Sequence, residues 1–189
     1  EGIGADVVSG GELYTALKAG FPASKIYMHG NNKLDYELEE AISAGVRCIV
    51  ADAVTEIDKI ERIASEKGVV QDILIRINPG VEAHTHAYIQ TAKTDSKFGF
   101  SVADGTAEKA AEYALSKAHV RLRGFHCHIG SQIFEKQSFV LAAEKCMDFA
   151  AKMKGKTGFV TEELNLGGGF GIWYTDEDRK IPPEGYAEY

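Results

Sequence analysis

The residues best suited to chemistry are the glycines of Asn165-Leu166-Gly167-Gly168-Gly169-Phe170-Gly171. They follow an apolar run, Phe159–Leu164, that predicts a strand. Four glycines in five positions leave a short loop without side chains, so that its backbone N–H groups can converge on an anion such as a phosphate. A tight turn without a ligand is the alternative interpretation. Polar clusters at the ends of several other predicted strands favour a binding loop.

A second cluster is His126-Cys127-His128-Ile129-Gly130-Ser131. Alternate residues of a strand share a face, so His126 and His128 are expected to point the same way. We expect an imidazole that stacks or handles protons, because histidine is flat, aromatic and titratable near neutral pH. A buried histidine bonded to backbone is the alternative, and a metal site is disfavoured because no carboxylate or cysteine has a suitable local spacing. Ser131 could bind a phosphate or cap the next helix.

Arg76 interrupts an otherwise apolar strand, Ile73–Ile77. A buried arginine must be paired or must meet an anion. An ion pair with Asp6 or Asp52 on neighbouring strands and a functional role both remain open. A bare backbone loop, an imidazole, a hydroxyl and a buried arginine would together suit a flat phosphorylated cofactor.

These residues must be positioned by a repeating unit of strand, polar end, helix and glycine. The predicted strands are Ala5–Val8, Lys25–Met28, Arg47–Ala51, Ile73–Ile77, Leu122–Ile129 and Thr161–Leu166. The predicted helices are Glu12–Ala19, Leu34–Ala44, Val54–Lys67, Thr106–Ala118 and Lys136–Lys154, and residues 81–101 are predicted to be an irregular stretch. The strands are nearly continuous apolar runs, which is typical of parallel strands buried on both faces.

This pattern predicts the α/β class and a (β/α)8 TIM-type barrel, here six of eight units, rather than a doubly wound sheet. No G-x-G-x-x-G closes the first strand–helix turn, and polar clusters end all six strands, whose carboxyl ends face one mouth in a barrel. We expect one domain over residues 1–189, truncated at both ends. The chain opens at Glu1, and Pro182-Pro183-Glu184 signals a helix start just before Tyr189.

Composition narrows the function classes. A net charge of −7 and a pI near 5.4 argue against binding to nucleic acid, which needs clustered Lys and Arg. No apolar run reaches about 18 residues, so no membrane span is predicted. The widely spaced Cys48, Cys127 and Cys146 are expected to be buried thiols in a reducing cytoplasm.

Six motifs occur in one order and carry a resemblance to a known family. They are Gly4-Ala5-Asp6-Val7-Val8-Ser9-Gly10-Gly11-Glu12-Leu13, Gly30-Asn31-Asn32-Lys33, Arg76-Ile77-Asn78-Pro79-Gly80, Ser96-Lys97-Phe98-Gly99, His126-Cys127-His128-Ile129-Gly130-Ser131-Gln132 and the glycine loop. Together they resemble the diaminopimelate decarboxylase family. That family belongs to the fold-type III, alanine-racemase-like enzymes that use pyridoxal 5'-phosphate (PLP), alongside ornithine and arginine decarboxylases.

The resemblance implies a role for each matching residue. His128, the candidate catalytic residue, would stack on the PLP ring, while Ser131 and the backbone of Gly167, Gly168 and Gly169 would hold the phosphate. Arg76 and Asp6 would lie near the Schiff-base end of the cofactor. The implied reaction removes a carboxylate from the D-centre of meso-diaminopimelate to give L-lysine in lysine biosynthesis. No metal is implied.

The resemblance also implies segments that this chain does not match. The family's Schiff-base lysine would lie upstream of Glu1, and its catalytic cysteine and C-terminal β-domain downstream of Tyr189. We therefore expect the full-length protein to be a homodimeric decarboxylase and this segment alone to be inactive. Another decarboxylase or racemase on the same scaffold, a non-catalytic PLP-binding homologue and a phosphosugar-binding barrel without PLP are the alternatives.

Overall fold

The computed structural model describes residues 3–81 and 98–175. Its strands are β1 (Ala5–Val7), β2 (Ile26–Met28), β3 (Cys48–Ala51), β4 (Gln71–Asn78), β5 (Phe100–Ser101), β6 (Val120–His126) and β7 (Glu163–Asn165). Its helices are α1 (Gly10–Lys18), α2 (Asp35–Ala44), α3 (Val54–Lys67), α4 (Thr106–Leu115) and α5 (Lys136–Thr157), with a 3-10 turn at Ala23–Lys25. Every strand and helix predicted from the sequence is therefore present, with ends that differ by a few residues.

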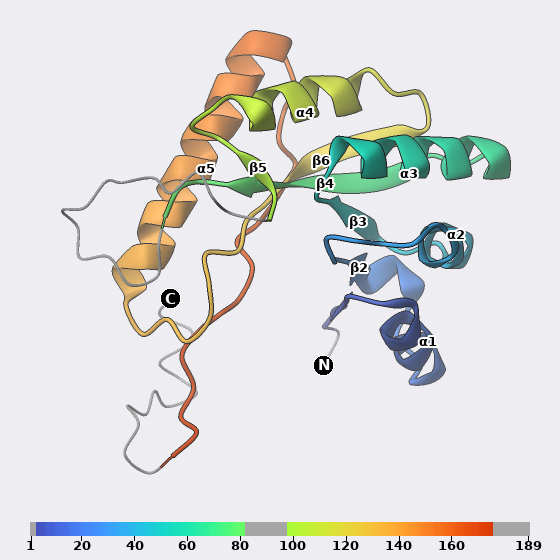
Figure 1. Ribbon diagram of the computed structural model, residues 1–189, viewed down its shortest axis with the longest axis horizontal. Helices are drawn as coiled ribbons and strands as arrows, with labels where there is room; N and C mark the ends of the chain where they lie inside the picture. The colour runs from blue at the N-terminus through green and yellow to red at the C-terminus, as the bar shows by residue number, and fades with distance from the viewer. Residues whose placement is uncertain (1–2, 82–97, 176–189) are drawn as a thin grey trace.

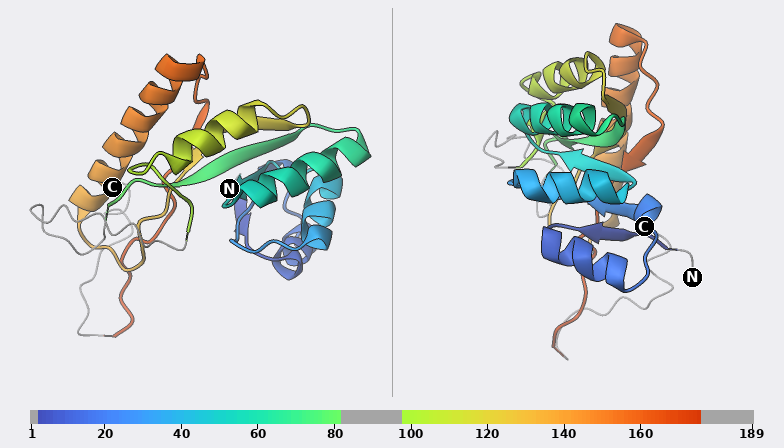
Figure 2. Two further views of the ribbon diagram at one scale, coloured as in Figure 1. Left: turned by 45° about the horizontal axis from the view of Figure 1, so that its top comes forward. Right: turned by 90° about the vertical axis from the view of Figure 1, so that its right-hand side faces the viewer.

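The sheet is parallel, with the strands in the order β1-β2-β3-β4-β6-β7, and short β5 pairs with β4. Each strand thus lies beside the next one along the chain, apart from β5. A doubly wound sheet would reverse its strand order at a switch point. The observed order confirms the prediction of a partial barrel, and Figures 1 and 2 show the sheet curving with the helices along its outer side.

Alternation along the strands separates an outer from an inner face. The outer-facing Ile73, Ile75 and Ile77 of β4 are buried in the main core with apolar residues of the helices. Phe125 of β6 meets Phe149 of α5 edge to face, with ring centroids 4.8 Å apart. Burial of these side chains between sheet and helices is the main force that holds the half-barrel together.

Helices α2 and α3, like α5, end where a glycine takes the left-handed conformation that other residues adopt at a cost. Gly45 follows α2 with φ 70°, and Gly68 follows α3 with φ 65°. Both were predicted as helix stops. Another glycine is needed for close packing, because a Cβ at Gly124 of β6 would lie 1.8 Å from the carbonyl oxygen of Glu163.

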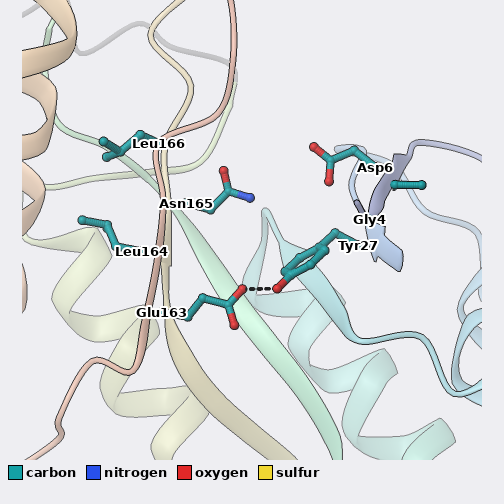
Figure 3. A pocket seen from close by; sticks show the side chains of 8 residues that line it. Gly4, Asp6, Tyr27, Glu163, Leu164, Asn165 and Leu166 are labelled. Atoms are coloured by element: carbon teal, nitrogen blue, oxygen red, sulfur yellow. Dashed lines mark hydrogen bonds between the residues drawn. The ribbon is translucent and has the colours of Figure 1, made fainter. Parts of the chain in front are cut away.

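The inner face carries a network of charges that ties together strands distant in sequence. Glu163 of β7 accepts a hydrogen bond from the Tyr27 hydroxyl of β2 (Figure 3). It accepts another from Arg47, whose Nη2 is 3.1 Å away. Burial, followed by the neighbouring Glu163, raises the pKa of Tyr27 to about 12. Asp72 of β4 accepts bonds from Arg121 at 2.6 and 3.0 Å and from Arg47 at 3.1 Å. The network therefore spans the inner side from β2 to β7.

Two details differ from the sequence-based expectation, and two predicted features lie outside the described residues. Strand β6 ends at His126 rather than Ile129, and the stretch predicted to be irregular contains β5, which pairs Phe100 with Ile77. The rest of that stretch, residues 82–97, and the predicted helix start at Pro182 lie outside the described residues. Among residues 3–81 and 98–175, no helix is long and apolar enough to cross a membrane.

Candidate active site

The carboxyl ends of β6 and β7 bring the two strongest sequence motifs together. A Cβ on Gly167 would lie 2.9 Å from Nδ1 of His128, and a Cβ on Gly169 would lie 3.3 Å from Cε1 of the same ring. The imidazole of His128 therefore packs directly against the glycine loop. A side chain at Gly167 would collide with the ring, and one at Gly169 would crowd it. His128 itself is exposed.

The segment that contains Ser131 runs beside the same loop. The N–H of Ile133 donates to the carbonyl of Gly169 at 2.9 Å, and the N–H of Gly171 donates to the carbonyl of Ile133 at 2.9 Å. A Cβ at Gly169 would lie only 1.9 Å from the carbonyl oxygen of Gly130. Ser131, which is exposed, thus stands within two residues of these contacts, while Gly168 has no neighbouring atom within 4 Å of a Cβ position.

Gln132 joins the segment that contains Ser131 to the end of the glycine loop through two hydrogen bonds. Its side-chain amide donates to the carbonyl of Ile172 at 2.8 Å, and its side-chain oxygen accepts from the N–H of Ile172 at 2.9 Å. Its φ of 57° is the one positive value among the described residues other than glycine. Strain of this kind is found where the surrounding structure fixes a functional loop. Gln132 is the last residue of the motif that begins at His126, but the sequence alone did not predict a role for it.

Arg76 lies on the inner face of β4, in register with His126 of β6. Its Nη1 is 3.4 Å from Oδ2 of Asp52, and its guanidinium stands over the Phe98 ring at 4.7 Å. The sequence left Asp6 and Asp52 open as partners, and the structure pairs Arg76 with Asp52. Asp52 also accepts a hydrogen bond from the N–H of Gly99, so this aspartate joins the end of β3 to β4 and to the residues before β5.

Asp6 occupies the inner face of β1 and lines an open pocket of about 460 Å³ between the two edge strands (Figure 3). The pocket is lined by Gly4, Ala5, Asp6, Tyr27, Glu163, Leu164, Asn165 and Leu166. Oδ1 of Asp6 is 3.4 Å from Nε2 of His29. Asp6 is therefore connected to the other predicted site residues through His29, whose ring in turn contacts His126.

A pair of histidines that sequence reasoning did not connect lies between these groups. The rings of His29 and His126 meet edge to face, with centroids 4.8 Å apart. His126 is 3% exposed, and among the described residues its Nδ1 has no hydrogen-bond partner. The sequence could have indicated this pair through position, because each histidine lies on the inner face at the end of a predicted strand.

The two histidines of the sequence motif are both harder to protonate than free histidine. Burial, followed by the neighbouring His29 and Arg76, lowers the pKa of His126 to about 2. Although His128 as a whole is exposed, its ring is partly covered by the glycine loop, and this partial burial and then the charge of Arg76 also lower the pKa of His128. Both imidazoles are therefore neutral at pH 7.

The low pKa of His126 predicts a dependence of stability on pH. Because unfolded histidine titrates near pH 6.5, the unfolded chain binds the extra proton between that value and about pH 2. Above that range His126 is neutral in both states, and its full contribution to the free energy of unfolding is present. Within the range, that free energy falls by up to about 1.4 kcal/mol for each pH unit by which the pH is lowered. The free energy of unfolding, measured with urea, should fall between pH 6 and pH 5. This fall should be about 1 kcal/mol smaller in His126→Asn than in the unaltered protein. Equal drops in the two proteins would contradict this assignment.

The fold and this arrangement define a parallel α/β half-barrel with an anion-ready backbone loop and a neutral imidazole at the carboxyl ends of its strands. The comparisons with known proteins agree with that description. The sequence matches the family described as "Pyridoxal-dependent decarboxylase, pyridoxal binding domain" over residues 1–189, and the chain belongs to that family.

Individual relatives are similar over nearly the whole chain. The chain is 54% identical to the diaminopimelate decarboxylase of Bacillus methanolicus, covering 100% of this chain and 44% of that protein. It is 52% identical to that of Bacillus subtilis (strain 168), covering 100% and 43%. The crystal structure of diaminopimelate decarboxylase from M. jannaschii in co-complex with L-lysine superposes with a TM-score of 0.87 at 39% identity, covering 98% and 42%. The chain thus spans less than half the length of these relatives.

Proposed function

We propose that the protein carrying this chain is a PLP-dependent decarboxylase that converts meso-diaminopimelate to L-lysine and carbon dioxide. The observation that carries the proposal is the packing of His128 against the bare backbone of Gly167–Gly169 at the carboxyl ends of β6 and β7. The substrate is inferred from relatives that are 54% and 52% identical and named diaminopimelate decarboxylase, and from the lysine in the structural neighbour.

The residues of this chain fit a phosphorylated ring. The positions of Gly167 and Gly169 admit no Cβ, so a backbone surface is kept free of side chains beside an imidazole. We assign the amides of Gly167, Gly168 and Gly169 and the hydroxyl of Ser131 to the phosphate. The N–H of Gly167 donates to Oδ1 of Asn165 at 2.8 Å, so phosphate binding would exchange that hydrogen bond for one to the anion. Backbone N–H groups in such a loop bind an anion without the cost of ordering a side chain.

The other residues orient the cofactor and control charge near it. Neutral His128 can stack on the pyridine ring without adding a positive charge to it. Arg76, fixed by Asp52 and Phe98, places a positive charge on the inner face, and Asp6 places a negative one on β1. When bound, PLP supplies an electron sink for the carbanion left by decarboxylation, and the protein positions the bond to be broken.

The setting of the enzyme is also part of the proposal. We assign it to the cytoplasm, because Cys48, Cys127 and Cys146 are all buried and free, as expected in a reducing compartment. We further propose a homodimer. The relatives are more than twice as long as this chain, and we propose that segments of the full-length protein outside this chain complete the active site.

The test uses the full-length protein and His128→Ala. Loss of one stacking contact is expected to raise the dissociation constant of PLP about tenfold, measured by absorbance titration after removal of the cofactor. His119→Ala is the control. Nδ1 of His119 is 3.1 Å from Oε1 of Glu61 on the outer side of the sheet, so this substitution should leave PLP affinity unchanged. Lysine formation from meso-diaminopimelate is measured in parallel.

The possible outcomes separate the candidate functions. Turnover of meso-diaminopimelate with lysine as product supports the proposal. Decarboxylation of ornithine or arginine in its place would assign the chain to another branch of the family. PLP binding without turnover of any amino acid would indicate a non-catalytic homologue, and no PLP binding at all would reject the site.

A further inference from the structure

Lys33 is buried at the carboxyl end of β2, although lysine is among the residues least often found inside a protein. It is 4% exposed. Its Nζ donates to the carbonyl of Gly30 at 2.6 Å, to the carbonyl of Val50 at 2.7 Å and to Oε1 of Glu56 at 2.5 Å. An ammonium group has three protons, so all of them are used.

The partner, Glu56 of α3, extends the same link to the end of β3. The side chain of Glu56 is only 7% exposed, and its second oxygen, Oε2, accepts from the N–H of Asp52 at 3.4 Å. Asp52 is the residue that pairs with Arg76 and with the N–H of Gly99. A single hydrogen bond, from the N–H of Asp52 to Glu56, therefore connects the buried Lys33–Glu56 pair to the aspartate that pairs with Arg76.

The other end of the link reaches His29. Gly30, whose carbonyl accepts from Lys33, directly follows His29 and has a φ of 109°. The N–H of His29 donates to the carbonyl of Val7 at 2.7 Å, which fixes the histidine backbone against β1. The His29 side chain then meets His126 and Asp6. One ammonium group thus connects the turn that carries His29 with the strand end that carries Asp52.

We propose that Lys33, held by Glu56, is a positioning residue that sets the relative placement of His29 and Asp52 in the candidate PLP site. This inference rests on the proposed function, because it concerns the same site. Lys33 does not act as an amine toward the cofactor, since its three protons are committed to Gly30, Val50 and Glu56. A purely structural role, in which the pair only stabilises the fold, is the competing account.

The experiment uses the full-length protein, freed of PLP, with Lys33→Met and Glu56→Gln. Each substitution removes one charge of the ion pair while approximately preserving side-chain length. The expected result is a dissociation constant for PLP raised at least about tenfold in both variants. In the protein without cofactor, the imidazole NMR signals of His29 and His126 should shift in both variants, because the turn that carries His29 loses its anchor.

Ile63→Ala is the matched control. Ile63 lies about two turns beyond Glu56 on α3, is fully buried and belongs to the main core, so its truncation lowers the melting temperature at a distance from the pair. PLP affinity and both imidazole signals should stay as in the unaltered protein. A merely structural role of Lys33 predicts the opposite pattern, with affinity following melting temperature in all three variants.

PLP affinity within about twofold of the unaltered protein in folded Lys33→Met and Glu56→Gln, with unshifted imidazole signals, would overturn the inference. If Lys33→Met does not fold, Glu56→Gln decides alone, because glutamine has nearly the shape of glutamate. Failure of the unaltered protein to bind PLP would reject the proposed function. In that case the imidazole signals still decide whether Lys33 positions His29.

Discussion

Replacing Asp72 by alanine is expected to lower the free energy of unfolding by about 1.5–3 kcal/mol, because it removes a buried carboxylate that accepts charged hydrogen bonds from two partly exposed arginines. The Asp72 side chain is 8% exposed and accepts bonds from Arg121 and Arg47, and Arg123 approaches to 3.8 Å. The network links β3, β4 and β6, so its loss affects the sheet itself. Urea unfolding of the full-length protein measures the change.

Asp58→Ala is the control for this substitution. Asp58 is also ion-paired, with Lys117 at 2.8 Å, but its side chain is 49% exposed. Exposed pairs contribute about 0–1 kcal/mol, so this variant should lose no more than that. Equal losses in Asp58→Ala and Asp72→Ala would contradict the view that burial makes the inner network important.

Replacing Gly169 by alanine is expected to have the largest effect on the candidate site. Gly169 has a φ of 98°, which side chains rarely adopt, and a Cβ there would lie 1.9 Å from the carbonyl oxygen of Gly130. The loop must move away from Gly130 and His128. We expect a loss of about 1–3 kcal/mol in stability and a loss of PLP affinity of tenfold or more, on the order of 1.4 kcal/mol.

Gly168→Ala is the matched control for stability. A Cβ at Gly168 meets no atom within 4 Å, and its φ is not among the positive values. The free energy of unfolding should therefore change by less than about 0.5 kcal/mol. A large loss of stability in Gly168→Ala, or none in Gly169→Ala, would contradict the described loop geometry.

Local patterns in the sequence were sufficient to predict the elements of the fold. The apolar run at Ile73–Ile77, interrupted only by Arg76, predicted a strand buried on both faces. The glycines after α2 and α3 predicted the ends of those helices. Strand β5 was missed because two residues are too short to show a period, and they are held by pairing with β4. The end of β6 was extended too far, because residues 127–129 keep the alternating pattern without pairing as a strand.

Contacts between distant segments could not be predicted in the same way. The sequence suggested that His128 and Gly167–Gly169 share one mouth, and the structure brings them into contact. The pairing of His29 with His126 and of Lys33 with Glu56 depends on the register of β2, β3 and β6, which no local pattern encodes. The roles of Asp6, Arg76, His128 and Ser131 toward PLP stay predictions.

The most direct test of this account is a crystal structure of the full-length protein with PLP bound. It should place phosphate oxygens within about 3 Å of the amides of Gly167–Gly169 and of the Ser131 hydroxyl, with the imidazole of His128 stacked on the pyridine ring. A phosphate held elsewhere in the protein, or a pyridine ring that does not touch His128, would contradict it.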